Sequence, residues 1–399
     1  MNQRPFFSIV VACYNSRLTI GTLLESILNQ ELDKEDYEVI ISDDCSTEPY
    51  DDILAEYADK MNMKKVVTDY NCCPGNTRQR GLENVSGRWI CFSDHDDEFV
   101  PGSLKKLKDL MENEYKYEQY YLVTGFIKRN SFSFNSDDEP LSASQTGAWT
   151  HGKFYNYDNL IKPYNIRYKQ DLKSNEDIYF NTKVKCVIAT LQAKYADAGR
   201  FVEDLYTYIW NNHPGSQSHS MSEDGNHTFF ERTFLDFAQA TGEAYLEEFY
   251  KGQMPWAMTR ELIKNIFIVY YFYSTSFLYF NPNHYSQYVF PYLTQFFNRV
   301  KSEFAITNKE VWAYVTADYC TNYETTRAMC EGGTGVFPPS LTFVQWLEAI
   351  CPDAEPIQDA LFYITPKEGN QNGKDKSERE SNTNTGQSKA GSPCSLFRT

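Results

Sequence analysis

The sequence has no excess of basic residues. Among its 399 residues, Lys and Arg number 38 against 54 Asp and Glu, and the formal net charge is −16 at pH 7. A surface that binds nucleic acid needs a concentrated positive patch, and anionic lipid attracts the same charge. The composition therefore argues against nucleic acid as a partner and against a protein-wide attraction to anionic membranes.

The sequence also lacks a long hydrophobic run and a leader segment. The longest apolar stretch, Ile266 to Tyr273, is far shorter than the roughly 20 residues that a membrane-spanning helix needs. Met1 to Pro5 leads directly into a strand-like run, so no signal peptide is expected. The ten cysteines show no metal-ligand spacing. These features predict a cytoplasmic protein with reduced thiols, and peripheral attachment at the inner face of the cell membrane stays open.

Apolar segments of two periods alternate along the first half of the chain. Continuous runs with β-branched residues predict buried strands, and apolar residues at i, i+3, i+4 and i+7 predict helices. Strands are expected at 6–13, 37–42, from 66, at 89–92 and at 120–126, and helices at 20–28, 53–61, 77–84, from 101 and at 174–186, with a loop at 71–76. This alternation predicts an α/β fold with a mostly parallel sheet flanked by helices.

The pattern changes after about residue 210, which predicts three regions. Residues 1–220 form the α/β domain, residues 221–366 form a helical region rich in Phe and Tyr, and residues 367–399 form a disordered tail. The tail has too few apolar groups to offset the entropy of ordering. Residues 256–280 are apolar on all sides of a helix, which favours packing in a core or against a second subunit over membrane contact. A homo-oligomer through the helical region is therefore kept open.

Four acidic residues within five positions follow the predicted strand at 89–92: Asp94, Asp96, Asp97 and Glu98. Carboxylates about 4 Å apart repel by roughly 4 kcal/mol per pair at an effective dielectric near 20, so a cation is expected among them. Oxygen ligands on a short turn suit Mg²⁺ or Mn²⁺ better than zinc. The alternative is an acidic turn that caps a helix beginning near Pro101.

Polar residues follow three of the predicted strands at the point where each ends. They are Tyr14-Asn15, Asp43-Asp44 and the stretch 94–97. Carboxyl ends of parallel strands meet at one edge of a sheet, and ligands of open α/β folds bind there. The sequence therefore predicts one cleft built from segments far apart in the chain.

Seven short motifs, in order and spacing, resemble family 2 glycosyltransferases of the GT-A fold. They are Val10–Asn15, Asp43–Ser46, Arg78–Ile90, Asp94–Pro101, His151–Tyr155, Asn175–Phe180, and Tyr208 with His213–Ser216. The resemblance covers about the first 210 residues and does not extend to the helical region. It implies inverting transfer of a sugar from a nucleotide-sugar to an acceptor hydroxyl, as in bacterial surface-polysaccharide synthesis.

The resemblance also implies roles for individual residues. Asp44 resembles the acid that accepts a hydrogen bond from the base, which favours uracil and hence a UDP-sugar. In the motif Asp94-x-Asp96, Asp96 is the expected metal ligand and Asp94 assists at the metal or the ribose. The other donor-binding candidates are Ala12, Tyr14, Arg78 and His95, and His213 is a further metal candidate.

Each of these side chains has a plainer interpretation. Tyr14 could simply pack, Arg78 could be a solvated helix arginine, and His95 could be a spacer. Asp97 is expected to be structural and to bond nearby backbone, and His213 could be a loop histidine before Pro214. These alternatives stay open at the level of the sequence.

Glu176 and Asp177 are the predicted catalytic pair. Inversion needs a base on the face opposite the leaving group, so the base must come from a segment other than 94–97. The resemblance makes Asp177 the general base, with an ordinary pKa near 4 that leaves it ionised at pH 7. Ser174-x-x-Asp177 also fits a variant of the capping box at a helix start. The two roles compete for one carboxylate.

Two rival functions belong to other classes. A nucleotidyltransferase would need a Gly-rich phosphate loop after the first strand, but residues 13–17 contain no glycine and the next one is Gly21. A non-catalytic nucleotide-sugar-binding module would not need both acidic motifs. The sequence therefore favours a glycosyltransferase that uses Mn²⁺ or Mg²⁺ and acts on a saccharide or a lipid-linked saccharide.

Overall fold

The computed structural model describes residues 4–113, 120–131, 149–172, 174–192 and 199–212, with short stretches and single residues between 240 and 307. The chain divides into two compact units, Met1–Thr259 and Arg260–Thr399. The predicted boundary at residue 220, the aromatic helix at 256–280 and the tail at 367–399 lie outside the described residues.

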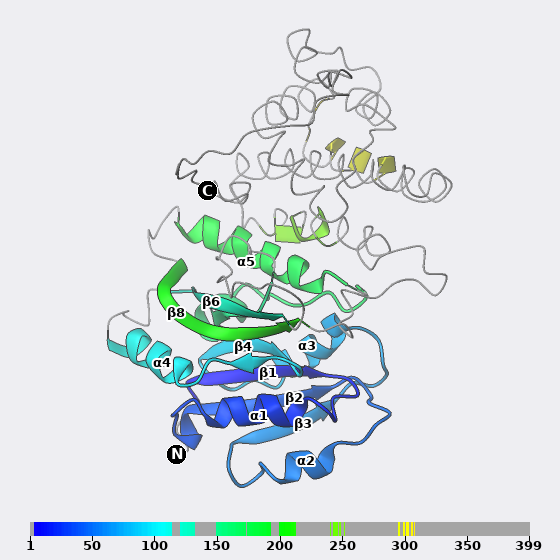
Figure 1. The fold of residues 1–399 in the computed structure, drawn as a ribbon. Coiled ribbons are helices and arrows are strands. Elements are labelled where there is room, and N and C mark those ends of the chain that lie inside the picture. Colours follow the sequence, from blue (N-terminus) through cyan, green and yellow to red (C-terminus); the bar gives the residue numbers. More distant parts are fainter. Residues whose placement is uncertain are drawn as a thin grey trace, which may run out of the picture. The chain divides into compact units, whose positions relative to one another are not determined.

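Strands and helices alternate through the described part of the first unit (Figure 1). The strands are β1 (Phe7–Cys13), β2 (Tyr37–Asp43), β3 (Met63–Val67), β4 (Trp89–Asp94), β5 (Glu98–Phe99), β6 (Leu122–Ser131), β7 (Lys153–Asn156) and β8 (Gly199–Asn212). The helices are α1 (Ile20–Leu28), α2 (Asp51–Ala55), α3 (Pro74–Leu82), α4 (Ser103–Asn113) and α5 (Glu176–Gln192), with short turns of helix η1 (Lys34–Asp36) and η3 (Tyr157–Ile161).

The strands form one mixed sheet in the order β3-β2-β1-β4-β7-β6-β8-β5. From β3 to β4 all neighbours run parallel, and β6 and β8 are also parallel. The pairs β4–β7, β7–β6 and β8–β5 are antiparallel. Parallel neighbours need a crossover connection, which α1, α2 and α3 supply for the first four strands. The α/β fold is confirmed, with its parallel portion concentrated in the first half.

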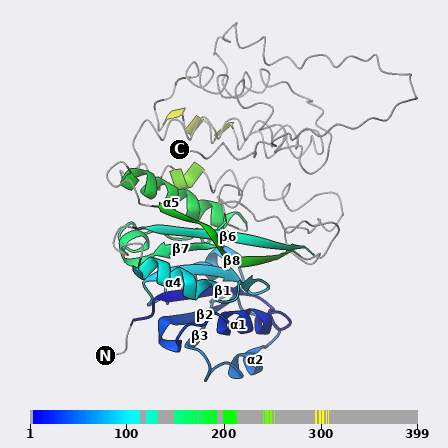
Figure 2. The same ribbon diagram turned by 60° about the vertical axis from the view of Figure 1, so that its left-hand side comes forward.

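Helices cover both faces of the sheet because apolar side chains point alternately to either side. On β1, Ile9 and Val11 belong to a core shared with α1 and α4, whereas Val10 belongs to a second core that includes Phe180 of α5. In both ribbon views α1 and α2 lie beside the first strands and α5 lies beside β6 and β7 (Figure 2). Two packed cores make the sheet a rigid base for the segments at its edge.

Two predicted elements differ in extent. Val66 and Val67 end β3 instead of beginning it, since Met63 to Lys65 pair with β2 despite their two lysines. The helix α2 ends at Ala55 instead of reaching 61, and only Leu54 of this helix is buried. Both elements lie at the edge of the sheet, where weak periodicity predicts boundaries poorly.

The helix α3 begins at Pro74, so the predicted loop at 71–76 ends at Cys73. Proline suits the first helical position because its missing N–H would have no helical partner there. The two-residue strand β5 was not predicted, because it exists only through its pairing with β8.

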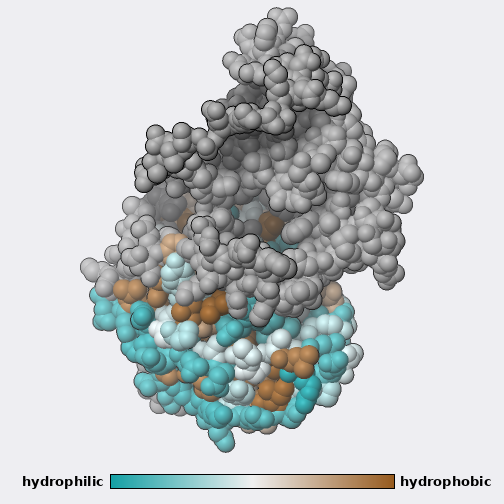
Figure 3. Space-filling model, viewed as in Figure 1, coloured by the Kyte–Doolittle hydropathy of each residue, from teal (hydrophilic) through white to brown (hydrophobic). Residues whose placement is uncertain are grey.

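The face of the described part that Figure 3 shows is mainly hydrophilic, with separate hydrophobic patches. Its exposed large apolar side chains include Leu18, which is 92% exposed, together with Tyr14, Val67 and Tyr70. Within the described ranges, no helix is both long enough and apolar enough to cross a membrane.

Candidate active site

The carboxyl ends of β2, β1 and β4 lie side by side. In the strand register Cys13 pairs with Asp43, and Ala12 pairs with Asp94. The polar residues that follow these strands are thus brought together, as the strand pattern predicts. Ala12 is half-buried in this row, and Tyr14 is 44% exposed. A contact of either residue with a nucleotide stays a prediction.

Asn15 fastens the end of β1 to the loop after β2. Its Oδ1 accepts hydrogen bonds from the backbone N–H groups of Thr47 and Glu48, at 2.9 and 3.1 Å. Its own N–H donates to Ser46 Oγ at 2.8 Å, and Asp43 Oδ1 accepts from the Ser46 N–H at 3.0 Å. Asn15 has a φ of +50°, which Asn tolerates better than most residues. These bonds fix the backbone on either side of Asp44.

Asp44 is held by the segment that links β3 to α3. It is only 6% exposed. Its carboxylate accepts hydrogen bonds from Thr68 Oγ1 at 2.9 Å, Asn71 Nδ2 at 3.2 Å and the Cys72 N–H at 3.2 Å. A carboxylate offers about four acceptor positions, so three donors orient it and leave room for one more.

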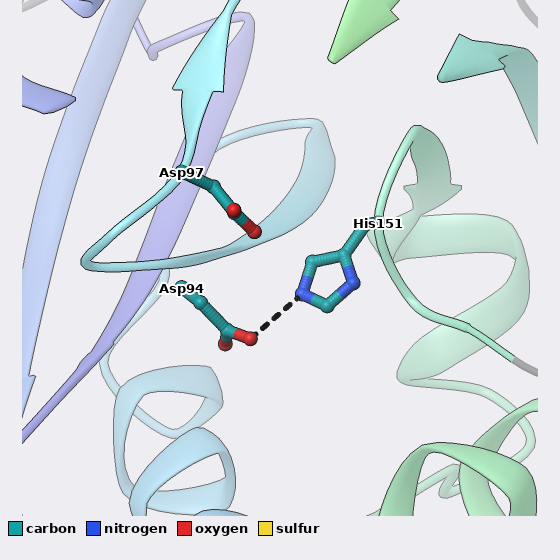
Figure 4. Close-up of side chains that lie close together, drawn as sticks. All are labelled: Asp94, Asp97 and His151. Carbon is teal, nitrogen blue, oxygen red and sulfur yellow. Dashed lines mark ion pairs between the residues drawn. The ribbon is translucent and has the colours of Figure 1, made fainter. Parts of the chain in front are cut away.

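Asp94, Asp97 and His151 bring three ligand atoms within 4.8 Å of one another (Figure 4). Asp94 ends β4, Asp97 lies in the turn that follows, and His151 comes just before β7. His151 Nε2 lies 3.4 Å from Asp94 Oδ2 and is buried without a hydrogen-bond partner. The imidazole stacks on the ring of Tyr208 at 5.1 Å between centroids, which aims its Nε2 at the two carboxylates.

The charges in this cluster are poorly balanced. Burial, together with the nearby Asp94 and Asp96, raises the pKa of Asp97 to about 8. Burial opposes the charge of Asp94, but Arg78 and His151 outweigh it and hold the Asp94 pKa well below its usual range. Burial likewise opposes a charged His151, but Asp94 raises the His151 pKa.

Two carboxylates and one imidazole are a donor set that fits a divalent cation. The Nε2 of His151 faces Asp94 Oδ2 without a closer hydrogen-bond partner, and the pKa of Asp97 is raised, so added positive charge is favourable here. Asp97 is also oriented, since Oδ2 accepts from the Tyr208 hydroxyl and Oδ1 from the Asn211 N–H, each at 2.8 Å.

The predicted metal ligands are only partly those that the structure gathers. Asp94 belongs to the cluster of three, but Asp96 does not, and the Asp96 carbonyl accepts from Asn211 Nδ2 at 2.9 Å. His213 lies outside the described residues. The sequence did not predict that His151 lies beside Asp94 and Asp97, although His151 is part of one of the family motifs. Spacing could not signal it, because His151 reaches Asp94 only through the packing of β7 against β4.

Arg78 joins the acidic cluster to α5. Its guanidinium donates from Nη2 to Asp94 Oδ1 at 2.6 Å and from Nη1 to Glu176 Oε1. Burial opposes this charge, but Asp94 and Glu176 outweigh it and raise the Arg78 pKa well above its usual value. Since Arg78 is 5% exposed, it is not a solvated helix arginine, and a contact with the nucleotide stays a prediction.

A glycine one turn before Arg78 lets the two helices come close. A Cβ on Gly75 would lie 2.6 Å from the Lys169 carbonyl oxygen and 3.0 Å from Glu176 Cβ. Any side chain at position 75 would therefore push α3 away from Glu176 and stretch the bond from Arg78.

Glu176 and Asp177 occupy the first turn of α5. Burial, with the charge of Glu176, raises the pKa of Asp177 to about 7, while Arg78 and His151 act in the opposite direction. This replaces the ordinary value near 4 expected from the sequence, because neither burial nor the paired acid could be weighed there. Asp177 Oδ1 accepts from the Ile178 N–H at 2.8 Å. Ser174 lies two positions before α5, whereas the serine of a capping box directly precedes its helix.

His95 points toward α1. Its Nδ1 lies 2.7 Å from the hydroxyl of Thr19, the residue that precedes the first turn of α1. This bond ties the acidic turn to the helix after β1. A donor contact of His95 stays a prediction.

Part of the chain matches a known protein family. The family model for glycosyl transferase family 2 matches residues 8–170. This segment of the chain is thus similar to glycosyl transferase family 2. The matched residues include Asp44, Arg78, Asp94 and His151, so most of the site lies within the family 2 region.

Two curated relatives carry the names of enzymes for a ribitol-phosphate polymer and for a diphosphoundecaprenol-linked sugar. Poly(ribitol-phosphate) beta-N-acetylglucosaminyltransferase TarS of Staphylococcus aureus is 28% identical over 183 residues, which are 44% of this chain and 32% of TarS. The UDP-Glc:alpha-D-GlcNAc-diphosphoundecaprenol beta-1,3-glucosyltransferase WfaP of Escherichia coli is 33% identical over 131 residues, which are 32% of this chain and 50% of WfaP. The match spans about a third of TarS and half of WfaP.

The same fold is found in solved structures. Residues 1–349 of S. aureus TarS in complex with UDP-GlcNAc superpose with a TM-score of 0.53 and 21% identity, covering 83% of this chain and 93% of that one. At this identity the likeness concerns the fold, and it confirms the GT-A fold that the motifs implied.

Proposed function

We propose that this protein transfers a sugar from a UDP-sugar to a hydroxyl of a saccharide or lipid-linked saccharide in cell-surface polysaccharide synthesis. The transfer inverts the anomeric centre and uses Mn²⁺ or Mg²⁺. One observation carries the proposal: Asp43 and Asp94 pair with neighbouring residues of β1 at the carboxyl ends of the strands, and Arg78 joins Asp94 to Glu176, the neighbour of Asp177.

Asp44 supplies the base contact. Its carboxylate is oriented by three donors and keeps one acceptor position. Uracil presents an imide N–H to such an acceptor. The name of WfaP includes UDP-Glc, and TarS has been solved in complex with UDP-GlcNAc. A UDP-sugar is therefore the favoured donor.

Asp94, Asp97 and His151 would hold the cation beside the diphosphate. A bound divalent ion neutralises a diphosphate and stabilises the charge that develops as it leaves. The protein's part is to orient these ligands: Arg78 holds Asp94 Oδ1, so Oδ2 stays directed toward His151. Tyr208 fixes both the Asp97 carboxyl and the His151 ring.

Asp177 takes the proton of the acceptor hydroxyl. It stands on α5, a different element from β4 and the turn after it, which carry Asp94 and Asp97, as a base on the opposite face requires. A base with a pKa of about 7 is well matched to proton transfer near neutral pH. Glu176 acts with it, since its charge raises the Asp177 pKa and its carboxylate is held by Arg78.

The test is release of UDP by the full chain with Mn²⁺ and no acceptor, using UDP-GlcNAc, UDP-glucose and GDP-mannose in parallel. We expect slow UDP release from one of the UDP-sugars, and a thermal shift with the same donor. A ligand at 100 times its Kd adds about 2.7 kcal/mol of stability.

The rival functions give other outcomes. Pyrophosphate release from UTP and a sugar phosphate would indicate a nucleotidyltransferase. Binding of a UDP-sugar without any turnover, with or without a saccharide acceptor, would indicate a binding module and overturn the proposal.

A further inference from the structure

Two adjacent thiols border the base contact. The sulfurs of Cys72 and Cys73 lie 3.2 Å apart. Both are directed at one carbonyl oxygen, that of Gln170, at 3.6 Å from Cys72 and 2.9 Å from Cys73. Cys72 is exposed and Cys73 is buried, so a reagent from solvent meets the Cys72 sulfur first.

The backbone of the same pair is part of the Asp44 site. The Cys72 N–H donates to Asp44 Oδ2 at 3.2 Å and Oδ1 at 3.4 Å. The preceding residue, Asn71, donates from Nδ2 to the Asp44 carbonyl at 3.0 Å and to its carboxylate at 3.2 Å. A change of conformation at Cys72 therefore reaches Asp44 directly.

From this geometry we propose that Cys72 and Cys73 form a dithiol site for oxidation by peroxides, and that closing the disulfide weakens UDP binding at Asp44. The effect on UDP rests on the proposed function, whereas the oxidation itself does not.

The chemistry balances as two thiols and one hydrogen peroxide giving one disulfide and two waters. The Cys72 sulfur attacks a peroxide oxygen, which forms a sulfenic acid and releases the first water. The Cys73 sulfur then loses its proton and attacks the Cys72 sulfur, which releases the second water. Burial raises the pKa of Cys73 to about 12, so its thiol stays protonated at neutral pH and the exposed Cys72 is the thiol that reacts with peroxide first.

A disulfide between neighbouring residues closes a small ring and strains the backbone of Cys72 and Cys73. Consecutive Cα atoms lie about 3.8 Å apart across a trans peptide, while disulfides usually join Cα atoms about 4.4–6.8 Å apart. Cys73 cannot absorb the change easily, because Pro74 restricts it to the extended conformation, observed at φ −168° and ψ 157°. The adjustment falls on Cys72, whose N–H holds Asp44.

Oxidation also removes both thiol hydrogens that point at the Gln170 carbonyl. Gln170 lies in the segment that leads to Glu176 and α5. Oxidation therefore also breaks the hydrogen bonds that join Cys72 and Cys73 to the segment before α5.

The first experiment reads the site without any nucleotide. The full chain is treated with hydrogen peroxide, freed of it, digested and mapped by mass spectrometry. We expect the peptide that contains Cys72 and Cys73 to lose two hydrogens and to regain them with dithiothreitol. An unchanged mass for that peptide would overturn the dithiol site.

The second experiment measures the Kd of UDP for the reduced, oxidised and re-reduced protein. If Asp44 is displaced, its charged carboxylate loses the hydrogen bond to the uracil base. Loss of such a bond weakens binding roughly 10- to 100-fold, so we expect the Kd of UDP to rise about tenfold or more and to return on reduction. Equal affinity in the reduced and oxidised forms would overturn the coupling. If the reduced protein binds no UDP, the proposed function and the coupling both fail, while the peptide mass still judges the dithiol.

Two variants complete the design. Cys73→Ser cannot close the ring, so its UDP affinity should not respond to peroxide. Cys45→Ser is the matched control, because Cys45 follows Asp44 directly and its sulfur donates to the Thr68 carbonyl at 3.0 Å. It should respond as the natural sequence does. A full response in Cys73→Ser would assign the effect to another thiol and overturn the proposal.

Discussion

Arg78 of α3 donates a 2.6 Å hydrogen bond to Asp94 at the end of β4, and its other terminal nitrogen donates to Glu176 at the start of α5. One buried cation thus connects the acidic cluster with the predicted base segment. Burial opposes the charge of Asp94, and Arg78 is the strongest of the neighbours that offset this effect and lower the Asp94 pKa.

Replacing Arg78 with Met should destabilise the fold. The change leaves Asp94 and Glu176 without their buried cation, and breaking a buried ion pair from one side costs about 3–5 kcal/mol. Urea denaturation measures the loss. Arg80→Met is the control, since Arg80 is exposed on the same helix and should change the free energy of unfolding by less than about 0.5 kcal/mol. Equal stabilities for the two variants would contradict the central role of Arg78.

Replacing His151 with Ala should weaken Mn²⁺ binding in the presence of UDP by about tenfold or more, because it removes one of three converging ligand atoms. Titration of Mn²⁺ against UDP binding measures this. Asp51→Asn, on the exposed helix α2, should leave the Mn²⁺ requirement unchanged.

Asp96→Asn, in the same titration, tests whether Asp96 is a metal ligand, as the sequence predicts, or whether the ligands are Asp94, Asp97 and His151. The sequence predicts that this variant abolishes metal-dependent donor binding. An unchanged Mn²⁺ requirement in Asp96→Asn, together with a loss in His151→Ala, would restrict the set to Asp94, Asp97 and His151.

Replacing Asp177 with Asn should lower kcat by at least about 100-fold and leave the Kd of the UDP-sugar unchanged, because general-base catalysis contributes that much and the donor contacts are elsewhere. Asp171→Asn is the control, since Asp171 precedes the same helix and its side chain is 71% exposed. Near-normal turnover in Asp177→Asn would remove Asp177 from the mechanism.

The pH dependence of kcat/KM should show a limb that rises with pH and has a midpoint near 7. Asp177 accepts a proton only when ionised, and its pKa of about 7 leaves it protonated at lower pH. Burial and then the charge of Glu176 raise this pKa, and Arg78 and His151 lower it. A rate that is flat from pH 5 to 8 would show that the carboxyl titrates at its ordinary value.

The raised Asp177 pKa should also make the free energy of unfolding depend on pH, in the direction opposite to kcat/KM. Between the unfolded pKa near 4 and the folded pKa of about 7, the unfolded chain loses the Asp177 proton first, so stability falls as pH rises. Asp177→Asn should lose less stability than the natural sequence between pH 5 and 8. Parallel denaturation curves at the two pH values for both proteins would count against the raised pKa.

The sequence predicted most elements of the first half of the chain and their order, but not the strands β5, β7 and β8. The apolar run at 6–13 and the helical spacing at 20–28 reappear as β1 and α1, because the periodicity of apolar residues is a local property of the chain. The meeting of Asp44 with Asp94 at one sheet edge was also predictable, since parallel strands place their carboxyl ends together.

Only the tertiary structure decided how these groups are charged and what they touch. His151 reaches Asp94 because β7 adds to β4 as an antiparallel strand, a pairing that no residue spacing encodes. Arg78 reaches Glu176 because Gly75 lets α3 approach α5. The Asp177 pKa follows from burial beside Glu176, and burial depends on every element packed around a side chain. Residue order fixes which groups are available, and long-range packing fixes their distances and hence their chemistry.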